Sequence, residues 1–177
     1  MWFDGAMQLI ELRKWSVRCE PDLTREAYAL MDCGAAETCG CEACFNFATT
    51  RHLTYTPEIL ELLDWLGIDP ALEAEARHDA RLGDGRQRYT VCFYLVGEIA
   101  SGPLTPVARC GAYETTSLED AGEGSSVGFC AGDDPPEAFR GLPVVCLEVS
   151  VVAPWISNAP EPGLAEEGET WPPGARF

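Results

Sequence analysis

The sequence predicts an α+β fold, in which an antiparallel sheet and a few short helices form a single domain. The length of 177 residues fits one domain. Residues 86–96 and 144–152 have strand periodicity, residues 56–67 have helical periodicity, and no regular strand–helix alternation links them. We expect residues 1–156 to form the domain and the Pro- and Glu-rich residues 157–177 to be a loose tail.

The first third of the chain predicts a strand, a short helix and a loop. Apolar and polar residues mix over residues 7–17 in a pattern typical of a strand, and residues 23–31 are mostly good helix formers. Residues 33–47, which include Gly34 and Gly40, are expected to form a loop that carries a cluster of cysteines.

The clearest local signal is that of a helix over residues 56–67. Thr56 is a favourable N-cap, Pro57 suits the first helical position, and Gly67 is typical of a helix end. The apolar residues at helical spacing are Ile59, Leu62, Leu63 and Leu66. Residues 71–76 are rich in Ala and Glu, and their propensity favours a further short helix.

The second half of the chain predicts strands. Residues 86–96 alternate, and the turn signal at residues 83–85 predicts pairing with the residues before it. A short strand is expected over residues 126–130 and a strong one over residues 144–152. On the last strand Cys146, Glu148 and Ser150 share a polar face that we expect to meet solvent or a site, although Cys92 and Cys146 themselves lie in apolar runs typical of a core.

The net charge of −17 excludes two classes of partner. It arises from 29 acidic and 12 basic side chains, and residues 101–177 alone carry twelve acids and three bases. Nucleic acid and anionic membranes would both repel such a chain, so we expect neither as a partner. No signal-peptide pattern follows Met1 and no apolar run approaches bilayer length, which predicts a cytoplasmic protein.

The one concrete chemical feature is a C-x-C-x-x-C cluster formed by Cys39, Cys41 and Cys44. In a reducing compartment such spacing favours metal binding, and a tetrahedral zinc ion takes soft thiolate ligands from a short turn. Two alternatives remain: unligated thiols in a polar loop, and a redox pair of Cys41 and Cys44. The redox pair requires a thioredoxin-like strand–helix context that the sequence lacks.

A fourth zinc ligand must come from another part of the chain. The two histidines are His52 and His78, and Cys33 precedes the cluster by six residues. The spacing alone leaves all three open as candidates.

Several segments together resemble a family of small uncharacterised bacterial proteins with no established activity. They are Cys39-Gly40-Cys41-x-x-Cys44-x-Asn46-Phe47, Leu66-Gly67-Ile68-Asp69-Pro70, Glu75-Ala76-Arg77-His78, Tyr94-Leu95-Val96-Gly97-Glu98-Ile99 and Pro154-Trp155-Ile156. The resemblance implies that Cys39, Cys41, Cys44 and His78 act as a unit, which favours His78 over His52 as the fourth ligand. Asn46 is expected to order its own turn through side-chain bonds to backbone N–H groups.

These observations predict a non-enzymatic binding or scaffold protein with a structural zinc site at Cys39, Cys41, Cys44 and His78. One alternative is an acidic inhibitor or immunity-type protein that binds a basic partner protein, since complementary charge speeds association. A second alternative is a metal- or thiol-dependent enzyme. The sequence contains no Gly-x-Ser-x-Gly, phosphate-binding loop or His-Glu-x-x-His pattern, so no catalytic residue is predicted.

Overall fold

The computed structural model describes residues 7–103 and 118–162. Its strands are β1 (Gln8–Leu12), β2 (Trp15–Cys19), β3 (Glu75–Arg81), β4 (Gln87–Ser101), β5 (Glu119–Gly122), β6 (Ser125–Ala131) and β7 (Val144–Ala153). Its helices are α1 (Pro21–Tyr28), α2 (Ala35–Cys39), α3 (Glu42–Thr54) and α4 (Pro57–Leu66), with one 3-10 turn, η1 (Glu137–Phe139). This arrangement confirms the α+β class and the single domain.

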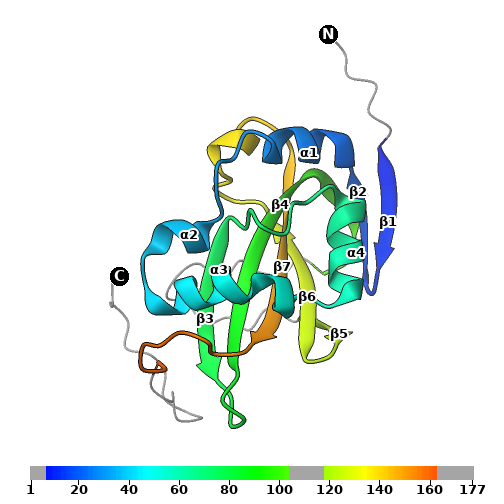
Figure 1. The fold of residues 1–177 in the computed structure, drawn as a ribbon. Coiled ribbons are helices and arrows are strands. Elements are labelled where there is room, and N and C mark those ends of the chain that lie inside the picture. The colour runs from blue at the N-terminus through cyan, green and yellow to red at the C-terminus, as the bar shows by residue number, and fades with distance from the viewer. Residues whose placement is uncertain (1–6, 104–117, 163–177) are drawn as a thin grey trace.

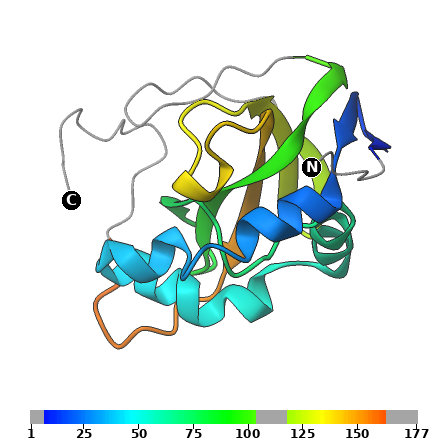
Figure 2. The ribbon, with the colours of Figure 1, turned by 90° about the horizontal axis from the view of Figure 1, so that it is seen from above.

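All seven strands belong to one antiparallel sheet. The order is β1-β2-β4-β7-β6-β5, and β3 pairs with β4 on the side where β2 also pairs. The long strand β4 therefore holds β3 along its first half and β2 along its last residues. Helices α3 and α4 lie on the same side of the sheet (Figures 1 and 2). The aromatic contacts of Phe47 with Tyr89 and of Tyr55 with Phe93 bind α3 and the residue after it to β4.

The expected strand over residues 7–17 is instead a hairpin. Strands β1 and β2 pair in antiparallel register, from Gln8 opposite Cys19 to Leu12 opposite Trp15. Arg13 turns the chain with a φ of 55°, which is a left-handed conformation uncommon for a residue with a side chain. The turn contains neither glycine nor proline, so the usual turn signal was absent from the sequence.

Helix α4 confirms the clearest prediction. The Thr56 hydroxyl accepts a hydrogen bond from the Ile59 N–H, and Pro57 occupies the first turn. Gly67 ends the helix with a φ of 75°, and a Cβ there would lie only 2.2 Å from the carbonyl oxygen of Pro21. Glycine is thus required at this position for the close approach of the first residue of α1.

Two further local expectations, one on a loop and one on a helix, were wrong. Residues 33–47 are not a loop, because α2 and the start of α3 occupy most of them. Residues 71–76 are not a helix: β3 begins at Glu75, and the Ala74 N–H already bonds to the Cys92 carbonyl. Pairing with β4 satisfies the backbone of this segment, and that tertiary gain outweighs the weak helix preference of Ala and Glu.

Strand β7 and residues 89–96 of β4 are buried on both faces. Their ladder runs from Gln87 opposite Ala153 to Val96 opposite Val144. Cys92 and Cys146 lie in the core as predicted. The expectation that Cys146, Glu148 and Ser150 meet solvent was wrong, since these side chains are at most 7 % exposed. A strand enclosed on both sides does not need strict polar alternation, so periodicity alone misplaced this face.

The buried side chain of Asn46 joins α3, β4 and the segment after β7. Its Nδ2 donates to Tyr89 Oη at 3.3 Å and to the Pro154 carbonyl at 2.9 Å. Its Oδ1 accepts from the backbone N–H groups of Ile156 at 2.8 Å and Ser157 at 3.3 Å. All four hydrogen-bonding positions of the amide are used. Asn46 does bond to backbone N–H groups as expected, but those groups lie more than 100 residues away rather than in its own turn.

The chain therefore continues in contact with the domain beyond residue 156. Ser157 Oγ also donates to Glu42 Oε2 at 2.8 Å, and Arg81 forms an ion pair with Glu161. The loose tail was expected from residue 157, but its first residues bond to α3 and β3. Residues 163–177, where the rest of that expectation falls, lie outside the described residues.

Replacing Asn46→Ala should lower the free energy of unfolding by about 3 kcal/mol, because it removes a buried amide and all four of its hydrogen bonds, including those to the Tyr89 hydroxyl and the Ile156 N–H. Denaturant unfolding measures this change. The matched control is Asn158→Ala at an exposed asparagine, expected to change stability by less than about 0.5 kcal/mol. Equal small effects of both substitutions would contradict this account of Asn46.

Candidate metal centre

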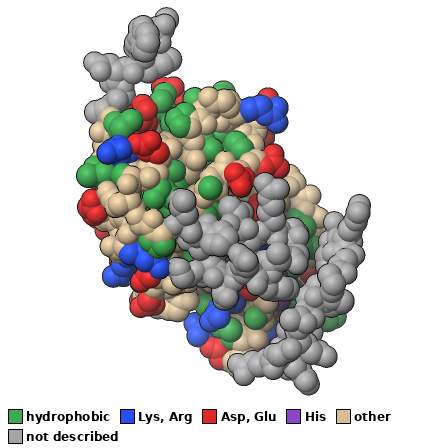
Figure 3. Space-filling view, turned by 180° about the vertical axis from the view of Figure 1, so that it is seen from behind, with side chains coloured by type: hydrophobic (Ala, Val, Ile, Leu, Met, Phe, Trp, Pro, Cys, Tyr) green, Lys and Arg blue, Asp and Glu red, His purple; other side chains and the backbone are tan. Residues whose placement is uncertain are grey.

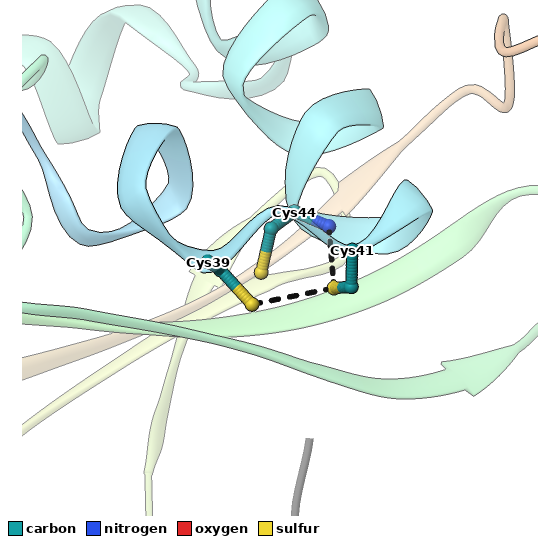
Figure 4. A group of neighbouring side chains, drawn as sticks. All are labelled: Cys39, Cys41 and Cys44. Atoms are coloured by element: carbon teal, nitrogen blue, oxygen red, sulfur yellow. Dashed lines mark hydrogen bonds between the residues drawn. The ribbon is translucent and has the colours of Figure 1, made fainter.

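The junction of α2 and α3 brings three sulfur atoms together. Cys39 is the last residue of α2, Cys41 is the N-cap of α3, and Cys44 lies in the first turn of α3. Between the helices Gly40 adopts a φ of 71°, which turns the chain sharply enough to fold Cys41 back beside Cys39. The three Sγ atoms all lie within 4.8 Å of one another. Figure 4 shows the three side chains with their sulfur atoms gathered at this junction.

The size of this group fits a single ion. The Cys39 and Cys41 sulfur atoms are 3.4 Å apart. In a tetrahedral site with Zn–S bonds of about 2.3 Å, the sulfur atoms lie about 3.8 Å from one another. The three thiols thus need only small side-chain adjustments to hold one tetrahedral metal ion.

The three thiols differ in their surroundings. Cys39 is exposed, Cys41 is half-buried and Cys44 is buried. The backbone N–H of Cys41 and the neighbouring thiols lower the pKa of the Cys39 thiol, whereas burial raises the pKa of Cys44. A bound cation would favour the thiolate form of its ligands and displace the thiol protons.

The sheet holds the first turn of α3 in place beneath the sulfur atoms. Tyr89 Oη donates to the Ala43 carbonyl at 3.0 Å while it accepts from Asn46. On the adjacent strand, the Ala76 carbonyl oxygen lies 3.9 Å from Cys44 Sγ. Residues of β3 and β4 therefore position the turn that carries Cys44.

His78 lies on β3 but is not part of the three-sulfur group. Its Nε2 is 2.8 Å from Gln87 Oε1, and its ring packs edge-on against Tyr89 at a centroid distance of 5.3 Å. The Gln87 Nε2 donates to the Gly85 carbonyl, so the amide oxygen faces the histidine. In this bond His78 Nε2 is therefore the donor and the amide oxygen of Gln87 the acceptor. Its role as a ligand stays a prediction.

The other two candidates for a fourth ligand are not brought to the cluster either. His52 is exposed on the last turn of α3, eight residues after Cys44, which places it about 12 Å further along the helix axis. That separation is too great for one ion. Cys33 is exposed ahead of α2 and lies outside the three-sulfur group.

The structure provides only part of the arrangement that a redox pair of Cys41 and Cys44 would need. Cys41 and Cys44 do occupy the N-terminal end of a helix, which is the position that a redox pair requires. The element before them is the helix α2, however, whereas the thioredoxin-like arrangement needs a strand. Cys39 Sγ also lies 3.4 Å from Cys41 Sγ, so Cys44 is not the sole sulfur neighbour of Cys41.

The remaining described cysteines have structural explanations. Cys19, Cys92, Cys130 and Cys146 are buried in the core, where a thiol behaves as a small apolar group. Burial raises the pKa of Cys19 to about 11, so this thiol is unreactive at neutral pH. Cys110 lies outside the described residues.

Searches among protein-family models, curated proteins and solved structures found no match to this chain. The resemblance to small bacterial proteins therefore stays a prediction.

In the part of the chain that the structure describes, no helix is both long and apolar enough to cross a bilayer. Figure 3 shows the rear face of the molecule. On the described residues visible there, acidic and basic side chains are interspersed, so they form no single charged docking surface on that part of the face.

Thiol labelling should separate Cys39 from Cys33, although both are exposed. In metal-free protein Cys39 should react faster, because its pKa is lowered and the thiolate is the reactive form. Added zinc should protect Cys39 and leave Cys33 reactive, as mass spectrometry of the labelled peptides would show. Equal labelling of Cys39 with and without zinc would count against a metal site.

Proposed function

We propose that this protein is a non-enzymatic binding or scaffold protein in which one zinc ion joins α2 to α3. The observation that carries the proposal is the group of three cysteine sulfur atoms within 4.8 Å of one another. Zinc suits this group because thiolates are its preferred soft ligands, whereas calcium and magnesium take oxygen ligands. Iron–sulfur clusters distribute their cysteines over several iron atoms, and this compact group suits one ion better.

A structural role follows from where the ion would lie. It would link the end of a five-residue helix to the first turn of a thirteen-residue helix. Structural zinc sites have four protein ligands, and their binding free energy adds to folding stability. The proposed ion would therefore hold α2 in place.

His78 is our candidate for the fourth ligand, through Nδ1. Its strand passes the cluster, since Ala76, two residues earlier on the same strand face, lies against Cys44. A metal-bound histidine usually donates its other ring N–H to a neighbouring oxygen, and Gln87 accepts such a bond from Nε2. Binding through Nδ1 would require the imidazole to move towards the three sulfur atoms.

The Cys41→Ser substitution tests the metal site without removing the helix cap. The Cys41 sulfur accepts from the Cys44 N–H, and a serine hydroxyl makes the same capping bond at least as well. Elemental analysis should find one zinc per wild-type chain and less than about half an equivalent in the variant. The thermal midpoint of the variant should no longer rise with added zinc, whereas Cys33→Ser should behave as wild type. An unchanged zinc content in Cys41→Ser would contradict the proposal.

The fourth ligand is tested separately with cobalt(II) in place of zinc. His78→Ala should change the visible absorption bands of the bound cobalt, because a nitrogen ligand is replaced by water. His52→Ala should leave the bands unchanged, since His52 lies too far along α3. Identical spectra for wild type and His78→Ala would remove His78 from the ligand set while leaving the three-cysteine site intact.

A further inference from the structure

Helix α2 is too short to position Cys39 by itself. It has five residues, and its N-cap residue is Gly34, which has no side chain that could cap the helix. A helix of this length has no independent stability in water, because the cost of nucleation exceeds what one turn returns. The position of its last residue, Cys39, must therefore depend on contacts that α2 makes with the rest of the fold.

Those contacts converge on one arginine and one buried carboxylate. Arg51 on α3 binds both carboxylate oxygens of Glu37 on α2, at 2.8 and 3.0 Å, and also Glu73 Oε1 at 2.9 Å. The same Glu73 Oε1 accepts from the Ala36 N–H at 2.9 Å, and the Glu73 backbone carbonyl accepts from Ala35 at 2.8 Å. We call Arg51, Glu37 and Glu73 the arginine brace.

The inner part of this brace is enclosed. Glu73 is fully buried and the Arg51 side chain is only 11 % exposed. A Cβ on Gly34 would lie 2.7 Å from Glu73 Oε1 and from the Ala71 carbonyl, so α2 begins in direct contact with the buried carboxylate. A buried ion pair of this kind tolerates little displacement, because moving one partner leaves the other charge unpaired.

We infer that the arginine brace positions Cys39 for metal binding, and that Glu37, Arg51 and Glu73 are positioning residues of the metal site. The inference rests on the proposed function. Glu37 is two residues from Cys39 on α2, while Arg51 lies on the same helix as Cys44. The brace thus links the helix of one sulfur ligand to the helix of the others. It brings the three sulfur atoms together before any ion binds, so that metal binding does not have to order α2.

The Glu37→Gln substitution tests the inference with the least risk to folding, because Glu37 is partly exposed and the buried pair of Arg51 and Glu73 stays intact. Zinc affinity is measured by competition with a chelator. The variant should bind zinc about tenfold more weakly, as is typical when a group that orients a metal ligand is lost. The matched control is Glu98→Gln, which removes a surface ion pair with Arg18 and should leave affinity unchanged.

A double-mutant cycle with Cys39→Ser separates positioning from general destabilisation. If the brace acts through Cys39, Glu37→Gln should cause no further loss of zinc affinity in the Cys39→Ser background. An equal loss in both backgrounds, or no loss in either, would overturn the inference while leaving zinc binding by the wild type intact. If the wild-type chain itself binds no zinc, the proposed function fails and this inference fails with it.

Discussion

The buried amide of Asn46 is the interaction on which the position of α3 depends. One side chain bonds at once to Tyr89 of β4, to the Pro154 carbonyl and to the N–H groups of Ile156 and Ser157. A fully satisfied buried polar network makes a core rigid and specifies one geometry. Because Asn46 lies two residues after Cys44, this bond network also fixes the turn that carries two of the three thiols.

The candidate metal centre lies between the five-residue helix α2 and the thirteen-residue helix α3. Helix α3 is held by the Asn46 network and by its aromatic contacts with β4. Helix α2 is held at its start by Glu73 and in its middle by Arg51 through Glu37. A zinc ion would add a third attachment at its end, where Cys39 is exposed. The proposed ion would thus stabilise a helix of which only Ala36 is buried.

Local signals predicted those elements that depend on local interactions. Helix α4 was predictable because the residues that begin and end it, Thr56, Pro57 and Gly67, are adjacent to it in the sequence. The three cysteines were found from spacing alone. Helix α2 was missed because the carboxylate that bonds to its first turn, Glu73, lies 37 residues away from Ala36 in the sequence. The role of Asn46 was only half predictable for the same reason, since its partners follow β7.

The most direct test of the account is X-ray absorption at the zinc edge on the purified protein. The account predicts three sulfur neighbours at about 2.3 Å and one nitrogen neighbour at about 2.0 Å around each zinc ion. Those sulfur atoms would be the ones of Cys39, Cys41 and Cys44. A first shell made only of nitrogen and oxygen atoms, or protein that retains no zinc, would contradict it.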